Sequence, residues 1–302
     1  MTKWLITGAN GNLGRNLIGA LLNESTGDDE VVAVVRSDRA AGTIANSVGE
    51  PLPERLTIRQ LNYTDVEALR DACAGADCVV HLVGILKEGG GASYHEAHEA
   101  SVEALLAAVA GTTVAHVTYL SIVGSTPTSS NACLASKGRA EAALREGAVA
   151  ACVLRVPMVL GRGDYASAAL ANRARKPASS GFRMTSLEQP IFADDVVRAI
   201  RQAATLRLDA SLDLGGPEVL TRAALTERAA AVLGGETRVR SLPRGLGFAM
   251  ASVLGLLPNP PVTRAMLEVL DHDDDVDSKL ALDALQMDSL TPLDEMLRAV
   301  LS

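Results

Sequence analysis

The sequence is poor in cysteine, and its few cysteines are not paired. Four occur among 302 residues, with no CxxC motif and no spacing that suits a metal, at positions 73, 78, 133 and 152. Disulfide scaffolds and cysteine-based zinc sites both need closely paired cysteines, so this usage favours a reducing compartment. We therefore expect a cytoplasmic protein without a metal site.

We also expect neither a targeting segment nor a membrane-spanning run. Only residues 1–3 precede the first apolar strand, which leaves no room for a leader. The most apolar stretch, residues 245–257, is shorter than the roughly 20 residues that a helix needs to cross a bilayer. We expect this stretch to be a packed helix, with association to a membrane interface as the alternative.

Basic residues are outnumbered by acidic ones. The 28 lysines and arginines against 36 aspartates and glutamates give a formal net charge of -8 and a pI near 5.2. This balance argues against a nucleic acid or an anionic membrane as the partner. It leaves room for a local basic pocket that binds a phosphate.

What the sequence does contain is a glycine-rich turn at its start. An apolar strand, residues 4–6, leads into Gly8, Gly11 and Gly14, and helical apolar spacing begins at residue 15. In such a turn the first glycine permits the tight bend, the second lets the backbone approach a pyrophosphate, and the third allows helix and strand to pack closely. Strand, glycines and helix in that order predict a dinucleotide-binding site rather than an ordinary turn.

The start of the following helix is expected to hold the pyrophosphate. The backbone amides of Asn12 and Leu13 would lie at the helix N-terminus, where unpaired N–H groups and the macrodipole favour an anion. We include Asn10, from the same turn, among the residues that contact the cofactor.

The end of the second predicted strand, residues 30–36, distinguishes the two nicotinamide cofactors. An acidic residue there would bind the ribose hydroxyls of NAD and repel the 2′-phosphate of NADP. This strand ends instead in Arg36, followed by Ser37 and Arg39, which suit a phosphate through charge-assisted hydrogen bonds. We expect NADP(H) to be favoured and NAD(H) to be possible; the alternative is a solvated surface arginine.

Further strands and helices alternate along the chain, which predicts a doubly wound parallel sheet. Strands are expected over residues 56–61, 77–84, 116–125, 151–157, 212–216 and 238–241. Helices are expected over residues 15–22, 66–74, 94–110, 136–146, 196–204 (with an aspartate as N-cap), 223–233 and 263–270. We expect residues 1–165 to form mainly a dinucleotide-binding domain and residues 166–302 mainly a substrate or interaction lobe, with residues 189–215 returning to the core.

Several residues at the carboxyl ends of these strands are further candidates for cofactor contacts. Asn62 and Tyr63 follow the third strand, where an adenine ring would rest; a packing role is an equal alternative for Tyr63. Leu82, Val83 and Gly84 close the fourth strand, and Gly84 would let a cofactor ribose approach the backbone. The glycine-rich segment after them, residues 87–93, is either a substrate lid or a plain loop.

Taken together, the motifs resemble the extended and atypical branches of the short-chain dehydrogenase/reductase superfamily over nearly the whole chain. The resemblance rests on TGANGNLG at 7–14, YLS at 119–121, SK at 136–137 and QPIFADDV at 189–196. The combination is most similar to bacterial relatives of the NAD(P)H-binding accessory subunit of respiratory complex I. It implies an α/β fold with a Rossmann-type doubly wound sheet and a small C-terminal α/β lobe.

The family's catalytic machinery is Tyr-x-x-x-Lys with an upstream Ser or Thr, in which the lysine lowers the pKa of a proton-passing phenol. The resemblance places Lys137 and Ser121 in these roles, but Cys133 stands at the tyrosine position and His98 at that of a common asparagine. We therefore expect ordinary ketone–alcohol chemistry to be impaired or absent. Ser121, Lys137 and Pro157 complete the expected cofactor contacts, with Lys137 on the nicotinamide ribose.

Two neighbouring side chains are candidate substitutes for the missing tyrosine. Cys133 is either a nucleophile activated by Lys137 or a small residue that fills space. Tyr119 lies on the same predicted strand as Ser121, and we expect it to point to the opposite face of the sheet, away from the site.

These observations leave three functions open. The first is an NADP(H)-binding protein with altered redox chemistry, or one that acts as a cofactor-dependent sensor or assembly component. The second is an active epimerase or reductase that acts on a sugar-like or quinone-like carbonyl through another proton donor. The third is an interaction subunit, with a protein partner or as a homodimer, that keeps the dinucleotide only for stability.

Overall fold

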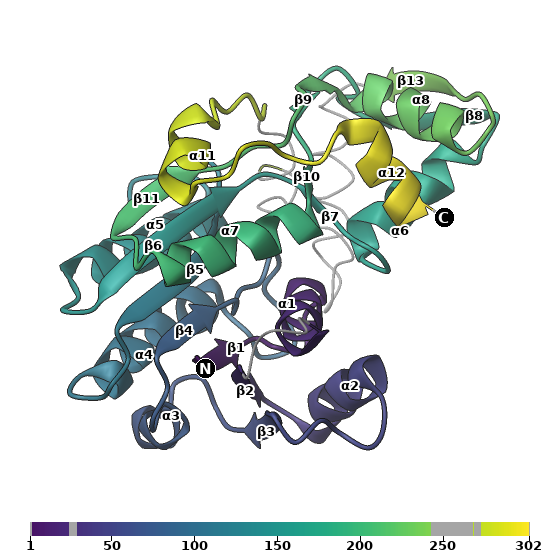
Figure 1. The fold of residues 1–302 in the computed structure, drawn as a ribbon. Helices are drawn as coiled ribbons and strands as arrows, with labels where there is room; N and C mark the ends of the chain where they lie inside the picture. The colour runs from purple at the N-terminus through teal and green to yellow at the C-terminus, as the bar shows by residue number, and fades with distance from the viewer. Residues whose placement is uncertain (1, 24–28, 243–267, 269–272, 302) are drawn as a thin grey trace.

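The computed structural model describes residues 2–23, 29–242, 268 and 273–301 (Figure 1). Within these ranges seven parallel strands form the central sheet, in the order β11-β6-β5-β4-β1-β2-β3. Their bounds are β1 Lys3–Thr7, β2 Glu30–Val35, β3 Leu56–Gln60, β4 Cys78–His81, β5 His116–Ile122, β6 Ala150–Val156 and β11 Ala210–Asp213. The strand order reverses between β1 and β4, and ligands of such sheets bind at this point, beside the carboxyl ends of the strands. The predicted Rossmann-type α/β fold is confirmed.

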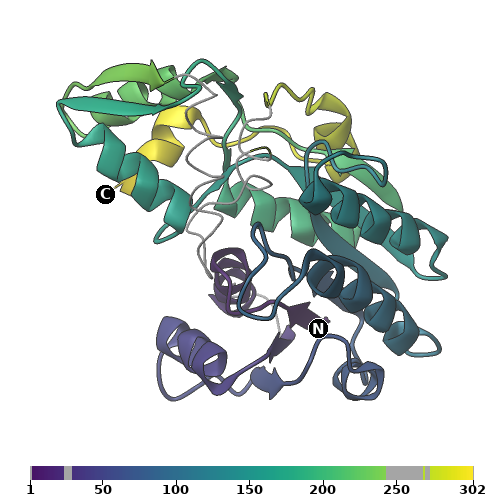
Figure 2. The same cartoon turned by 180° about the vertical axis from the view of Figure 1, so that it is seen from behind.

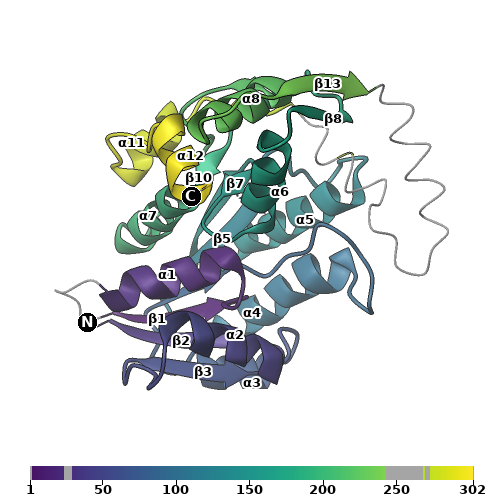
Figure 3. The same cartoon turned by 90° about the vertical axis from the view of Figure 1, so that its right-hand side faces the viewer.

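Helices cover both faces of the sheet, which explains why its strands are apolar on both sides. One face packs against α1 Asn12–Asn23, α2 Asp38–Val48, α7 Ala193–Thr205 and α11 Lys279–Leu285. The other face packs against α3 Val66–Ala72, α4 Ser101–Val109 and α5 Ala132–Glu146. A π-helical turn, η1 His95–Ala100, precedes α4. Figure 3 shows α1 and α7 together on one side and α4 and α5 on the other.

A smaller group of elements lies above the carboxyl end of the sheet in Figure 1 and is seen from behind in Figure 2. Its helices, α6 Tyr165–Ala174, α8 Arg222–Val232 and α12 Leu293–Leu301, share an apolar core of their own. Its strands form the pairs β7 Val159–Leu160 with β10 Ile191–Phe192, β8 Ala178–Phe182 with β13 Arg238–Leu242, and β9 Leu187–Glu188 with β12 Leu220–Thr221. The chain returns from this group to the main sheet through α7 and β11, because β11 pairs with β6.

Several predicted boundaries differ from the structure for local reasons. The fourth strand ends at His81, so residues 82–84 leave the sheet. Helix α5 begins at Ala132, four residues before the predicted start, because the Asn131 side chain accepts hydrogen bonds from the first amides of the helix. The expected aspartate N-cap of α7 is wrong: the helix starts at Ala193, and the buried Asp195 binds the backbone and hydroxyl of Thr291 instead.

Other differences concern whole elements. Helices α2, α6, α11 and α12 were not predicted. The predicted helix 263–270 and the apolar stretch 245–257 lie outside the described residues, except for position 268. None of the described helices is both long enough and apolar enough to cross a membrane.

Candidate dinucleotide site

The glycine-rich turn is held tightly at both of its ends. Gly8 adopts a φ of +69°, and a Cβ there would stand 2.9 Å from the carbonyl carbon of Leu82. A Cβ on Gly14 would stand 2.6 Å from the carbonyl oxygen of Ala9, so α1 packs against the turn at a distance that only glycine permits. Gly11, between them, is exposed. The turn therefore presents bare backbone on the outside of a rigid frame.

The start of α1 lies at the surface of this turn. The Asn12 side-chain amide donates to the carbonyl of Arg162 at 2.9 Å, which ties the turn to the loop after β7. Leu13 and Asn10 are half-buried beside it. The first amides of a helix have no partner within the helix, so this surface offers N–H groups to an anion.

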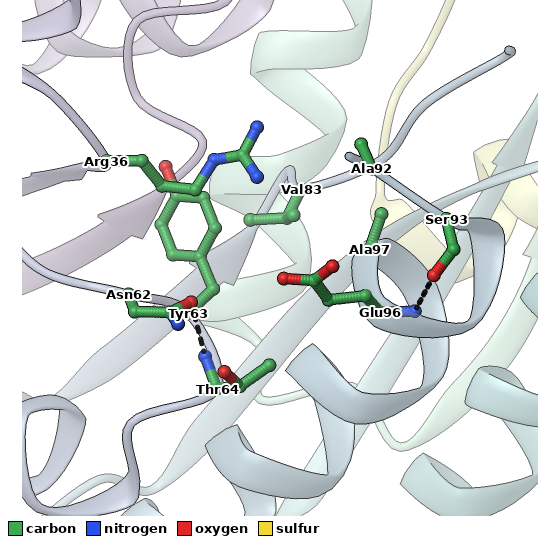
Figure 4. Close-up of a pocket in the computed structure, with 9 residues that line it drawn as sticks. All are labelled: Arg36, Asn62, Tyr63, Thr64, Val83, Ala92, Ser93, Glu96 and Ala97. Atoms are coloured by element: carbon green, nitrogen blue, oxygen red, sulfur yellow. Dashed lines mark hydrogen bonds between the residues drawn. The ribbon is translucent and has the colours of Figure 1, made fainter. Parts of the chain in front are cut away.

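A pocket opens beside the ends of β2, β3 and β4, and we call it the β2–β3 pocket (Figure 4). Its walls include Arg36, Asn62, Tyr63, Val83, Ser93 and Glu96. In the figure the guanidinium of Arg36 and the carboxylate of Glu96 face the space between the β-strand ends and the η1 turn. These walls come from four elements that meet only in the folded chain.

Tyr63 is both a fold residue and a wall of this pocket. It is buried, and its hydroxyl accepts from the Gly8 amide at 3.1 Å and donates to the carbonyl of Val34 at 3.2 Å. Burial raises the pKa of the phenol. The Arg36 guanidinium carbon stands 5.7 Å from the centre of the ring, within reach of a cation–π interaction. Tyr63 thus joins the glycine turn to β2 and supports Arg36.

The charged groups in and beside the pocket are exposed and have no ion partner among the described residues. Arg36 and Arg39 are both exposed, and within the described chain neither forms an ion pair. Ser37, which the sequence grouped with them, accepts from the Ala40 amide at 3.3 Å and caps α2. On the opposite wall, the Glu96 carboxylate forms no hydrogen bond or ion pair with any described residue.

Glu96 was not predicted as a site residue. Its side chain reaches the pocket from the π-helical turn η1, and its amide donates to Ser93. A π-helical turn is wider than an α-helical one, and it changes the direction of the residues inside it. The sequence predicted a regular helix over residues 94–110, so it gave no signal for this placement.

A second group lies at the ends of β5 and α5 and consists of Tyr119, Ser121, Cys133 and Lys137; we call it the α5 cluster. Lys137 is buried, and its Nζ donates to the carbonyl of Leu120 at 2.9 Å and to the Tyr119 hydroxyl at 3.2 Å. Burial lowers the pKa of Lys137 to about 8. A Cβ on Gly84 would stand 3.3 Å from this Nζ, so the glycine lets the lysine reach the end of β4.

The expected direction of Tyr119 is wrong. Side chains two residues apart on a strand share a face of the sheet, and Tyr119 points to α5 together with Ser121. The phenol is nevertheless 0 % exposed, and burial raises its pKa well above the usual range. It therefore lies within the α5 cluster without access to a ligand.

Ser121 is committed to a buried network. Its hydroxyl donates to one oxygen of Glu141 at 2.5 Å, and the other oxygen accepts from the Arg155 guanidinium at 2.6 and 2.9 Å. Ser121 is 2 % exposed and Glu141 1 % exposed. The hydroxyl that the family resemblance assigns to catalysis thus takes part in holding α5 to β5 and β6.

Cys133 and His98 are occupied in a similar way. Cys133 is fully buried, its thiol donates to the carbonyl of Ile85 at 3.6 Å, and burial raises its pKa to about 11. A thiol with this pKa is protonated at neutral pH, which argues against the predicted alternative that Cys133 is a nucleophile. His98 accepts from the Ile85 amide at 3.1 Å and its other ring nitrogen lies 2.7 Å from Ser136 Oγ. Burial lowers the pKa of His98 to about 3, so the ring is neutral.

The remaining predicted residues lie along the same edge of the sheet. Asn62 accepts from the Thr64 amide in a local turn, and Leu82 and Val83 follow the end of β4. Pro157 follows the end of β6. The fold therefore gathers the predicted residues along the carboxyl edge, with the β2–β3 pocket near one end and the α5 cluster further along it.

A sheet of this topology, with this turn at its switch point, defines a dinucleotide-binding protein of the Rossmann class. Over residues 8–181, more than half of its length, the chain matches the NAD(P)H-binding family, and it belongs to that family. No curated protein matches the sequence.

Solved structures similar to this one include those of sugar-nucleotide epimerases. UDP-glucuronic acid 4-epimerase from Bacillus cereus, in complex with NAD, is 18% identical, with a TM-score of 0.72 over 99% of this chain and 95% of that one. A nucleoside-diphosphate-sugar epimerase from Staphylococcus aureus is also 18% identical, with a TM-score of 0.73 over 99% and 100% of the two chains. UDP-glucose-4-epimerase from Stenotrophomonas maltophila, with bound NAD, is 17% identical, with a TM-score of 0.71 over 100% and 97%. At this identity the likeness concerns the fold.

Proposed function

We propose that this protein binds NADP(H) along the carboxyl edge of its sheet and responds to the cofactor as a sensor or assembly component, without tyrosine-dependent carbonyl chemistry. The observation that carries the proposal is the contrast in exposure between two groups. The cation of the β2–β3 pocket is exposed and forms no ion pair with a described residue, whereas the phenol, thiol and hydroxyl of the α5 cluster are buried and bonded to the protein itself.

The preference for NADP(H) rests on charge at the end of β2. The strand ends without an acidic residue, and Arg36 follows it with its guanidinium exposed beside the pocket. A planar guanidinium binds a phosphate through two parallel hydrogen bonds, which a lone ribose hydroxyl cannot match. In the proposed pose the 2′-phosphate binds Arg36, the adenine lies over the β2–β3 pocket and the pyrophosphate meets the amides of Asn12 and Leu13.

The lack of standard chemistry rests on the α5 cluster. Proton transfer to a carbonyl needs an acid within hydrogen-bond reach of the substrate. Among the described residues of this cluster, the phenol and the thiol are 0 % exposed and the Ser121 hydroxyl already binds Glu141. Lys137 keeps the role of binding the nicotinamide ribose.

The four cysteines are free and buried, which supports a reducing location such as the cytoplasm. The similarity to relatives of the complex I accessory subunit stays a prediction.

Equilibrium binding of NADPH and NADH tests the cofactor. We expect Arg36→Ala to weaken NADPH about tenfold and to leave NADH nearly unchanged, because only the phosphate contact is lost. Arg145→Ala, on the exposed last turn of α5, is the matched control and should change neither affinity. Binding of neither nucleotide, or equal loss of both in Arg36→Ala, would overturn the proposal.

Turnover tests the absence of standard chemistry. The full-length likeness to epimerases makes an active NAD(P)-dependent epimerase or reductase on a sugar-like or quinone-like carbonyl the second candidate. UDP-sugars, quinones and simple ketones are offered with NADPH or NAD, and product is measured. We expect no turnover; turnover that disappears in Lys137→Ala would establish the second candidate instead.

A further inference from the structure

We infer that Tyr119 is the positioning residue of Lys137: its phenol holds the lysine ammonium at the place where the proposed function needs it. The inference rests on that proposed function for its purpose but on separate contacts for its evidence. In the family that this chain resembles, the phenol beside the lysine belongs to a tyrosine four residues earlier on the same helix. In this chain that position is occupied by Cys133. This chain supplies a phenol to Lys137 from strand β5 instead.

The side chain of Tyr119 and a neighbouring carbonyl group hold the Lys137 ammonium in place. Lys137 Nζ lies 3.2 Å from the Tyr119 hydroxyl and 4.6 Å from the centre of its ring, and it also donates to the carbonyl of Leu120 at 2.9 Å. An ammonium has three N–H groups. Two of them are used by these acceptors, so one N–H group of the ammonium remains.

The phenol is itself held in place by a buried network. The Tyr119 ring stacks on His81 with 5.8 Å between ring centres. The two ring nitrogens of His81 lie 2.8 Å from the Thr7 hydroxyl and 3.2 Å from the Ser101 hydroxyl. Thr7 is the last residue of β1, directly before the glycine turn. The position of Lys137 is therefore tied through Tyr119 and His81 to the turn that is proposed to bind the pyrophosphate.

The phenol of Tyr119 stabilises the charge on Lys137, because no charged group bonds directly to the ammonium among the described residues. The titratable groups that face it are His81 on β4, His98 on η1, Tyr119 on β5, and Cys133 and Glu141 on α5. Burial lowers the pKa of both histidines to about 3, and Cys133 is a neutral thiol. Glu141 binds Ser121 and Arg155. The neutral oxygens of Tyr119 and Leu120 are thus the direct acceptors that stabilise the ammonium in a buried place.

Titration of Lys137 in the protein without cofactor tests this role directly. The chain has five lysines, so the ¹⁵Nζ and ¹³Cε signals can be resolved by NMR, with Lys137 assigned by its loss in Lys137→Arg. Tyr119→Phe keeps the ring but removes the acceptor oxygen, and we expect the midpoint of Lys137 to fall by about one pH unit. Tyr119→Leu also removes the ring and should lower the midpoint further. The control Tyr165→Phe removes a phenol that is 84 % exposed and should not move it.

An unchanged midpoint in Tyr119→Phe would overturn the inference, because a residue that only packs cannot alter the pKa through its oxygen. If this variant does not fold, replacement of the four tyrosines by 3-fluorotyrosine gives the same comparison with a weaker acceptor. A lower midpoint supports the inference, and an unchanged one overturns it.

The pH dependence of NADPH binding connects the inference to the proposed function. We expect affinity to fall as the pH rises through about 8, where Lys137 loses its proton, and to fall at a lower pH in Tyr119→Phe. Parallel loss of affinity at every pH would contradict the role of the phenol. Absence of NADPH binding by the unaltered protein would remove the proposed function, while the NMR titration would still decide the role of Tyr119.

Discussion

The β2–β3 pocket and the α5 cluster lie along one edge of the same sheet, yet their polar groups are used in opposite ways. In the pocket, Arg36 and Glu96 face an open space, and no described residue pairs with either. In the cluster, the hydroxyls of Ser121 and Tyr119 are buried and bonded to other groups of the protein. An unpaired exposed group is available to a ligand, whereas a satisfied buried group stabilises the fold.

This difference separates two properties that a dinucleotide enzyme needs together. Holding NADP(H) uses exposed backbone amides for the pyrophosphate and a cation for the 2′-phosphate, and the glycine turn with Arg36 offers both. Moving a proton requires an acid that reaches the substrate, and the residue at that position, Cys133, is a buried thiol. One edge of the sheet can therefore offer groups to a cofactor at one point and use its polar groups for the fold at another.

The largest expected effect is a loss of stability on substitution of Glu141, and it tests whether the α5 cluster serves the fold. If the α5 cluster is structural, Glu141→Gln should lower the free energy of unfolding by about 3 kcal/mol, because Arg155 loses the buried carboxylate that accepts two of its hydrogen bonds. Chemical denaturation measures this loss. Glu67→Gln, in the exposed pair with Arg70, is the control and should cost less than about 1 kcal/mol. A small effect at Glu141 would show that the cluster is free to serve a ligand.

A second effect concerns the neutral histidines near the cluster. The pKa of His98 is about 3 in the folded protein and about 6.5 when unfolded, so the unfolded chain binds the proton first as the pH falls. Stability should therefore decrease below about pH 6.5, by about 1.4 kcal/mol per pH unit for each such histidine. His98→Gln should reduce this slope, and His95→Gln, at a side chain 70% exposed, should not. Equal slopes in all three proteins would mean that His98 is accessible to protons.

The smallest expected effect is a change in NADPH affinity on substitution of Glu96 in the β2–β3 pocket. Glu96 faces the space in which the phosphate-bearing adenosine is proposed to bind, and a carboxylate there repels a phosphate. Glu96→Gln should strengthen NADPH binding about two- to threefold at low salt, with less gain at high salt because exposed charges are screened. Glu103→Gln, on the exposed side of α4, is the control. Weaker binding of NADPH in Glu96→Gln would instead indicate that the carboxylate accepts a hydrogen bond from the ligand.

The sequence by itself determined the fold class and the turn. Apolar strands, glycine spacing and helix starts are local patterns, and each element follows from residues that are neighbours in the chain. The steric roles predicted for Gly8 and Gly14 appear as close backbone contacts with Leu82 and Ala9. The absence of tyrosine at position 133 could also be read directly.

The tertiary structure decided what the polar side chains of the site do. Whether Ser121 faces a cavity or Glu141, and whether Tyr119 reaches Lys137, depends on how β5 packs against α5. The place of Glu96 in the pocket depends on a π-helical turn that the hydrophobic periodicity of the sequence did not predict. Exposure and pairing arise from contacts between distant parts of the chain, so the sequence could name the candidate residues but only packing decided which of them are open to a ligand.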